Sequence, residues 1–190
     1  MASYYQPTPA APPDYHGLPT LFGYENDDGK LSGTNCGLAA SCTLLTYLGK
    51  MPAAPTPTPH DNPNMIALEA TYPPNILFGL AGTSRGRVER ILDAYGCEPV
   101  EVDGEDALRQ SITSGVPVAV MLQIPGATHL GITFPAGHWM VAYGCDDQSI
   151  FLTNWDVAGM PWDAFRQGWS RFLPWCINMD RKGLQARVAG

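Results

Sequence analysis

The hydrophobic pattern of the chain changes at Gly115, and this change restricts the fold more than any other feature of the sequence. Before Gly115, apolar residues recur at helical spacing, for example at Val88, Ile91 and Leu92. After it, the runs VPVAVMLQI, HWMVAYG and QSIFLTN are rich in β-branched and aromatic residues, as is typical of strands. Helices that come first and antiparallel strands that follow predict an α+β fold.

In the first part of the chain, helices are expected in three places. The first begins at Cys36, in the turn that follows a polar loop, and stops at Gly49. The second is capped by Thr83 or Ser84, and the third covers about 103–114.

In the second part, a polar turn near Asp146 joins two apolar strands into an antiparallel hairpin. One short helix presents the aromatic residues of WDAFRQGW on one face, and PWCINM, residues 174–179, is expected to be the last strand. The prolines of segment 51–63 predict a loop, because proline has no N–H to donate and fixes its own backbone dihedral.

The length of the chain fits one domain. With 190 residues, a single hydrophobic core is able to bury most of the apolar surface. Residues 1–20 are rich in proline, alanine and tyrosine and have no periodicity. We therefore expect a flexible arm over 1–20 and one domain over 21–190.

Charge and hydropathy argue against several classes of partner. The formal net charge is −7 and the chain has 11 Lys+Arg, so no basic stripe is present for nucleic acid or an anionic membrane. No run approaches the roughly 18 apolar residues of a spanning helix. The first residues lack the basic start and apolar stretch of a secretory signal. The expected setting is the cytoplasm, or delivery by a secretion system that does not read a signal peptide.

The five cysteines do not form a pattern for disulfides or metal binding. Their number is odd and none of them forms a CxxC pair, so neither a metal nor another cofactor is expected. Four lie in or beside apolar runs and are interpreted as core residues: Cys42, Cys97, Cys145 and Cys176. Cys36 differs, because it stands at a predicted helix start.

Cys36 has the surroundings expected of a nucleophile. A helix N-terminus favours a thiolate, and the backbone N–H of Cys36 is placed to face an oxyanion. His138 opens a predicted strand and is the best candidate for the base. The hairpin returns the chain towards His138 with Asn154 and Asp156 on one strand face. Either side chain is able to orient the imidazole, and Asn154 is our first choice.

Together these motifs resemble papain-like cysteine peptidases. The matching segments are TNCGLAASCTLLTYLG, GHWMVAYGCDDQSIFLTNWD and WDAFRQGW, over about 21–169. The nearest resemblance is to the double-glycine leader peptidase domains of bacteriocin exporters and related stand-alone proteins. It implies a papain-like fold with Cys36 as nucleophile, His138 as base and Asn154 as the orienting residue, shielded by Trp155.

The sequence departs from that family at the side-chain oxyanion donor. The family usually has a glutamine about six residues before the nucleophile, where this chain has Lys30. The alternatives are an amide of Asn26 or Asn35, the ammonium of Lys30, or the backbone alone. Loss of one such donor lowers turnover by a factor of about 10²–10³.

The sequence therefore predicts a cysteine peptidase or amidase that forms an acyl-enzyme on a protein or peptide substrate. The resemblance makes small-residue sites such as Gly-Gly the first candidates. A delivered toxin effector with a cognate inhibitor protein fits the same features. Two alternatives stay open: a transglutaminase-like acyltransferase with the same triad, and a catalytically degenerate papain-like module that binds peptides.

Overall fold

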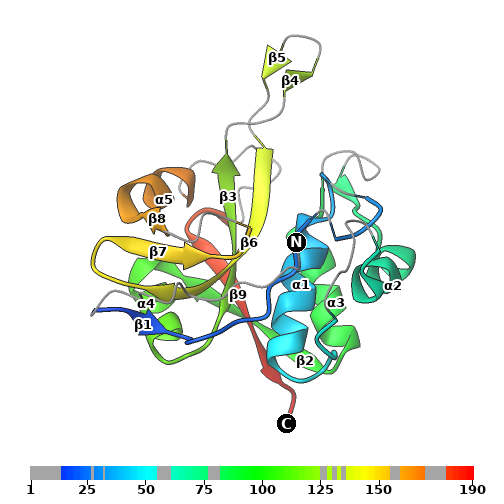
Figure 1. Ribbon diagram of the computed structural model, residues 1–190, viewed down its shortest axis with the longest axis horizontal. Coiled ribbons are helices and arrows are strands. Elements are labelled where there is room, and N and C mark those ends of the chain that lie inside the picture. The colour runs from blue at the N-terminus through cyan, green and yellow to red at the C-terminus, as the bar shows by residue number, and fades with distance from the viewer. Residues whose placement is uncertain are drawn as a thin grey trace.

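The computed structural model describes residues 14–26, 28–31, 33–54, 61–76, 82–124, 128–129, 132–133, 136–154, 159–169 and 179–190. These residues form helices on both faces of an antiparallel sheet (Figure 1). Within them, no helix has both the length and the apolar character needed to cross a membrane.

The helices confirm most of the pattern expected from the sequence. The described residues contain α1 (Cys36–Tyr47), α2 (Pro63–Thr71), α3 (Arg85–Ala94), α4 (Gly104–Thr113) and α5 (Trp162–Trp169). Of these, α2 was not expected. Its first residue is Pro63, which is tolerated there because the first helical N–H has no partner within the helix. Asn62 caps it by accepting hydrogen bonds from the backbone N–H of Asn64 and Met65.

The main sheet has seven strands in the order β2-β9-β3-β6-β7-β8, and β1 pairs with β6 beside this path. Their bounds are β1 (His16–Gly17), β2 (Cys97–Asp103), β3 (Val118–Ile124), β6 (Ala136–Cys145), β7 (Ser149–Leu152), β8 (Met160–Pro161) and β9 (Lys182–Val188). Each pairing is antiparallel, which confirms the α+β class. A separate pair, β4 (Thr128–His129) and β5 (Ile132–Thr133), extends beyond the ends of β3 and β6 in Figure 1.

Four strands of the main sheet were not expected from the sequence: β1, β2, β8 and β9. β2 and β9 pair with each other over their whole length. β2 lies at the edge of the sheet and exposes Glu98 and Glu101, so its sequence contains no continuous apolar run. The expected last strand at 174–179 lies outside the described residues, except for Met179.

β3 and β6 separate two hydrophobic cores. Met121 and Trp139 belong to the core beneath α1 and α3, whereas Leu122 and Met140 belong to the core beneath α4 and α5. This alternation follows from the two-residue period of a strand. Figure 1 shows α1, α2 and α3 on one side of the sheet and α4 and α5 on the other.

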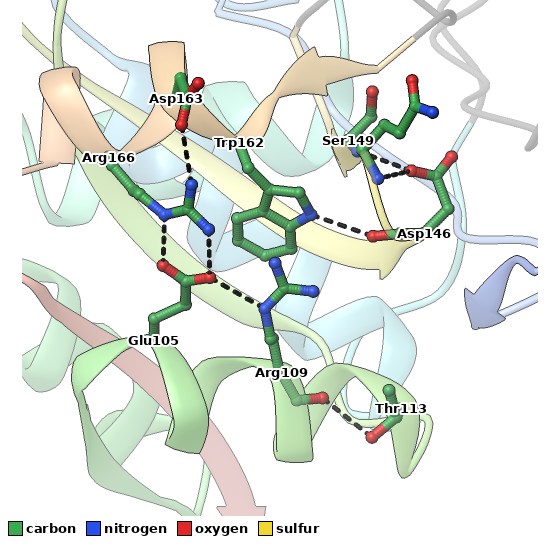
Figure 2. Close-up of polar contacts among 9 residues, drawn as sticks. Glu105, Arg109, Thr113, Asp146, Ser149, Trp162, Asp163 and Arg166 are labelled. Atoms are coloured by element: carbon green, nitrogen blue, oxygen red, sulfur yellow. Dashed lines mark hydrogen bonds and ion pairs between the residues drawn. The ribbon is translucent and has the colours of Figure 1, made fainter.

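The turn between β6 and β7 is held by contacts to α5 and α4. The Oδ1 atom of Asp146 accepts the backbone N–H of Gln148 at 2.7 Å and of Ser149 at 2.6 Å (Figure 2). The indole Nε1–H of Trp162 donates to the Asp146 carbonyl at 2.9 Å. The Arg109 guanidinium lies 3.5 Å from the centroid of that indole. These contacts stabilise the hairpin of β6 and β7, the strands that bring together the segments of His138 and Asn154.

Candidate active site

Cys36 is the first residue of α1, as the sequence predicts, and its side chain is buried. The backbone N–H groups of Trp139, Gly37 and Cys36 lie around the thiol and act to lower its pKa. Trp139 belongs to β6, so the nucleophile candidate touches the strand that carries His138. The helix start and the strand are about a hundred residues apart in sequence and come together only through packing of α1 on the sheet.

The N–H of Trp139 is accessible to Cys36 because β7 leaves this edge of β6. The backbone N–H of Val141 donates to Thr153 Oγ1 at 2.9 Å, and the Thr153 N–H donates to the Val141 carbonyl at 2.9 Å. N–H groups two residues apart in a strand point to the same edge, so the N–H of Trp139 points the same way. At Asn154 the chain turns away with φ of 58°. The sulfur of Cys36 then takes the place of a strand as the hydrogen-bond acceptor.

Burial sets the charge state of the two central groups. It raises the pKa of the Cys36 thiol, because the cost of desolvating the thiolate outweighs the three backbone N–H donors. This direction is the opposite of the one expected from a helix N-terminus alone. Burial also lowers the pKa of His138. Both shifts favour a neutral thiol and a neutral imidazole over a thiolate and an imidazolium.

Asn154 follows β7, the strand that pairs with the strand of His138. His138 is half-buried in β6, and Asn154 lies two residues beyond Leu152, the last residue of β7. The Asn154 Oδ1 atom is buried and has no hydrogen-bond partner among the described residues. An unpaired buried carbonyl oxygen is costly, and an imidazole N–H is a donor that would satisfy it.

The oxyanion candidates differ in their surroundings. Lys30 is exposed, and its backbone N–H donates to Glu69 Oε2 at 3.0 Å. Asn35 is fully buried, and its Nδ2 donates to Glu69 Oε1 at 2.6 Å, so one amide hydrogen is already engaged. Asp156 and Trp155 lie outside the described residues.

The sequence did not indicate the roles of two residues near Cys36, Thr83 and Glu69. The carbonyl of Thr83 accepts the indole Nε1–H of Trp139 at 2.8 Å, and its side chain packs on Gly37. Glu69 binds the loop before Cys36. The sequence indicates Thr83 only as a helix cap, and Glu69 lies on the unexpected helix behind the prolines. Neither position carries a local signal for its role.

The remaining cysteines behave as core residues where they are described. Cys42, Cys97 and Cys145 are buried and not in disulfides, which confirms the interpretation from the sequence, and Cys176 lies outside the described residues. In the same part of the chain, no three His, Cys, Asp or Glu side chains gather as a metal site would require.

Comparison with known proteins returns distant matches among solved structures. No family model and no curated protein matches the chain. One solved structure, described as a C39-like peptidase from Bacillus anthracis, shares 16% identity at a TM-score of 0.40, over 56% of this chain and 60% of its own. Another is the peptidase domain of Streptococcus ComA, a bifunctional ABC transporter involved in quorum sensing. It shares 12% identity at a TM-score of 0.49, over 91% of this chain and 96% of its own.

Both structures are described as peptidases. The chain spans less than two thirds of the first of them.

Proposed function

We propose that the protein is a cysteine peptidase or amidase that acts by acyl transfer, with Cys36 as nucleophile, His138 as general base and Asn154 as the residue that orients His138. The observation that carries this proposal is the packing of the start of α1 on Trp139, the neighbour of His138: a Cβ at Gly37 would lie 3.0 Å from Cδ1 of Trp139, and the Trp139 backbone N–H acts on the Cys36 thiol. It brings a thiol at a helix N-terminus to the histidine-bearing edge of a strand, as nucleophilic catalysis needs.

The reaction starts from neutral groups, in keeping with the raised pKa of Cys36 and the lowered pKa of His138. His138 accepts the thiol proton as the sulfur attacks the carbonyl carbon, and the backbone N–H groups of Cys36 and Gly37 stabilise the oxyanion. The C–N bond then breaks, the imidazolium of His138 protonates the departing amine, and a thioester remains. Water attacks the thioester while His138 accepts its proton, which releases a carboxylic acid and restores the thiol.

The buried oxygen of Asn154 supports the orienting role. An acceptor without a described partner, held at a left-handed backbone position, is a feature that structures keep where it serves a function. In the proposed triad this oxygen accepts the imidazole N–H and selects the tautomer whose other nitrogen faces the thiol.

Peptides with a small-residue site such as Gly-Gly are the substrates that we propose to test first. Peptides with a Gly-Gly site and matched Val-Val peptides separate a narrow site from a broad one. The cytoplasmic or delivered setting and the cognate inhibitor protein of a toxin effector stay predictions.

The proposal is tested by labelling with an epoxysuccinyl dipeptide, which needs both an attacking sulfur and a proton donor. The expected result is one adduct per chain at Cys36 by mass mapping, abolished in Cys36→Ala and strongly slowed in His138→Ala. Cys42→Ala is the matched control, because Cys42 lies on the same helix, is buried and should not react. The reaction is run near about pH 8, close to the ordinary thiol pKa.

Absence of an adduct in the folded wild-type protein would refute the proposal and favour a peptide-binding module. If the protein forms the epoxide adduct but couples an added amine to the substrate peptide in place of hydrolysing it, the reaction is an acyl transfer to the amine. The two fates use the same covalent intermediate, and a labelled amine added to a substrate peptide distinguishes them.

A further inference from the structure

Glu69 makes an unusual set of contacts for a carboxylate that is only 8% exposed. It projects from α2 and accepts three hydrogen bonds from the loop that leads to Cys36. Its donors are the backbone N–H of Lys30 at 3.0 Å, the backbone N–H of Leu31 at 3.1 Å and Nδ2 of Asn35 at 2.6 Å. Gly29 makes this approach feasible, since a Cβ there would collide with the carboxylate.

The bond from Asn35 to Glu69 has a direct consequence for α1. Asn35 is the N-cap of α1, yet its side chain caps no backbone N–H. At α2 the equivalent residue, Asn62, accepts from two N–H groups of the first turn, which is the usual behaviour of an asparagine N-cap. The Asn35 amide is therefore diverted to Glu69, and its Oδ1 is buried with no hydrogen-bond partner among the described residues.

The diversion leaves the first-turn donors of α1 to the nucleophile. The backbone N–H groups of Cys36 and Gly37 lie beside the thiol, and no side-chain cap competes for them. If the Asn35 amide swung back, its oxygen would accept from this turn and occupy donors that the thiolate and the oxyanion need.

We infer that Glu69 is a positioning residue for the proposed reaction: by holding the Asn35 amide away from the first turn of α1, it keeps the Cys36 and Gly37 N–H groups directed at the reacting atoms. The inference rests on the proposed function and extends it to a residue that does not touch the substrate. Glu69 acts through geometry, since the charges and donors that shift the pKa of Cys36 do not include it.

The test uses the epoxysuccinyl dipeptide and separates its inactivation rate constant from its apparent dissociation constant. Glu69→Gln is expected to lower the rate constant on the order of ten- to a hundredfold, as for loss of one oxyanion donor, with the dissociation constant unchanged within about twofold. Removing the competing cap in Glu69→Gln/Asn35→Ala should recover most of that loss. Glu89→Gln is the matched control, because Glu89 pairs with Arg85 on α3.

A purely structural role predicts a different pattern. The double variant would then be slower than Glu69→Gln, and Cys42 would become reactive to iodoacetamide as α1 loosens; either result overturns the inference. An unchanged rate constant in Glu69→Gln also overturns it.

A second readout separates this inference from the proposed function. Amide hydrogen exchange at Lys30 and Leu31 should become at least about tenfold faster in Glu69→Gln, because their acceptor is weakened. If the wild type forms no adduct while this exchange effect is present, the catalytic proposal fails and the loop-holding role of Glu69 stands. Unchanged exchange at both amides overturns the role of Glu69 itself.

Discussion

Replacing Gly37 by alanine tests how closely α1 packs on the site. A Cβ at Gly37 would lie 2.6 Å from Cβ and 2.8 Å from Cγ2 of Thr83, and 3.0 Å from Cδ1 of Trp139. Neither neighbour is free to move, since both are buried and the Thr83 carbonyl holds the Trp139 indole. Overpacking of this kind costs about 1–3 kcal/mol, whereas alanine in place of a helical glycine contributes up to about 1 kcal/mol of stability.

Gly86 provides a matched control for the helix contribution. It is the second residue of α3, as Gly37 is of α1, and a Cβ there meets no atom within 4 Å. The difference in unfolding free energy between Gly86→Ala and Gly37→Ala therefore isolates the packing cost, about 1–3 kcal/mol. This corresponds to a Tm difference of roughly 2–12 °C for a chain of this size.

Urea unfolding followed by tryptophan fluorescence measures this difference, provided that both variants keep the wild-type slope with denaturant. Epoxide labelling should also slow in Gly37→Ala and not in Gly86→Ala, because displacement of Gly37 moves the Cys36 sulfur from the Trp139 N–H. Equal stabilities of the two variants within about 0.5 kcal/mol would refute the packing argument.

Three further predictions concern backbone strain and pH. Asn154→Gly should be more stable than Asn154→Ala by about 1 kcal/mol in urea unfolding, because φ is 58°, and both should label slowly; equal stabilities would contradict a left-handed Asn154. The pKa of His138 is lowered in the folded state, so the free energy of unfolding should fall as the pH drops below about 6.5, where the unfolded chain binds the proton more tightly. His138→Gln should lose this slope and His16→Gln, at an exposed histidine, should retain it. The hydrogen bond from Arg166 lowers the pKa of Glu105 to about 2, so its contribution is present above about pH 4.5 and is lost towards pH 2; Glu105→Gln and the wild type should converge in stability there.

Much of the fold could be predicted from local pattern. Local pattern predicted the start of α1 at Cys36, the stop at Gly49 and the β6–β7 hairpin. Each of these features depends on residues within one turn or one strand of each other. β2 and α2 escaped prediction for physical reasons. An edge strand that exposes glutamates lacks an apolar run, and a helix that begins with proline looks like the loop that precedes it.

The sequence by itself determined which residue types are available for chemistry: a cysteine at a helix start, a histidine in a strand and an asparagine after its hairpin partner. Only the tertiary structure decided that the thiol meets the N–H of Trp139 and that Glu69 withdraws the Asn35 amide from the helix end. It also reversed the expected direction of the Cys36 pKa. Helix termini and turns depend on neighbouring residues, whereas desolvation and contacts between distant segments depend on how the helices pack on the sheet.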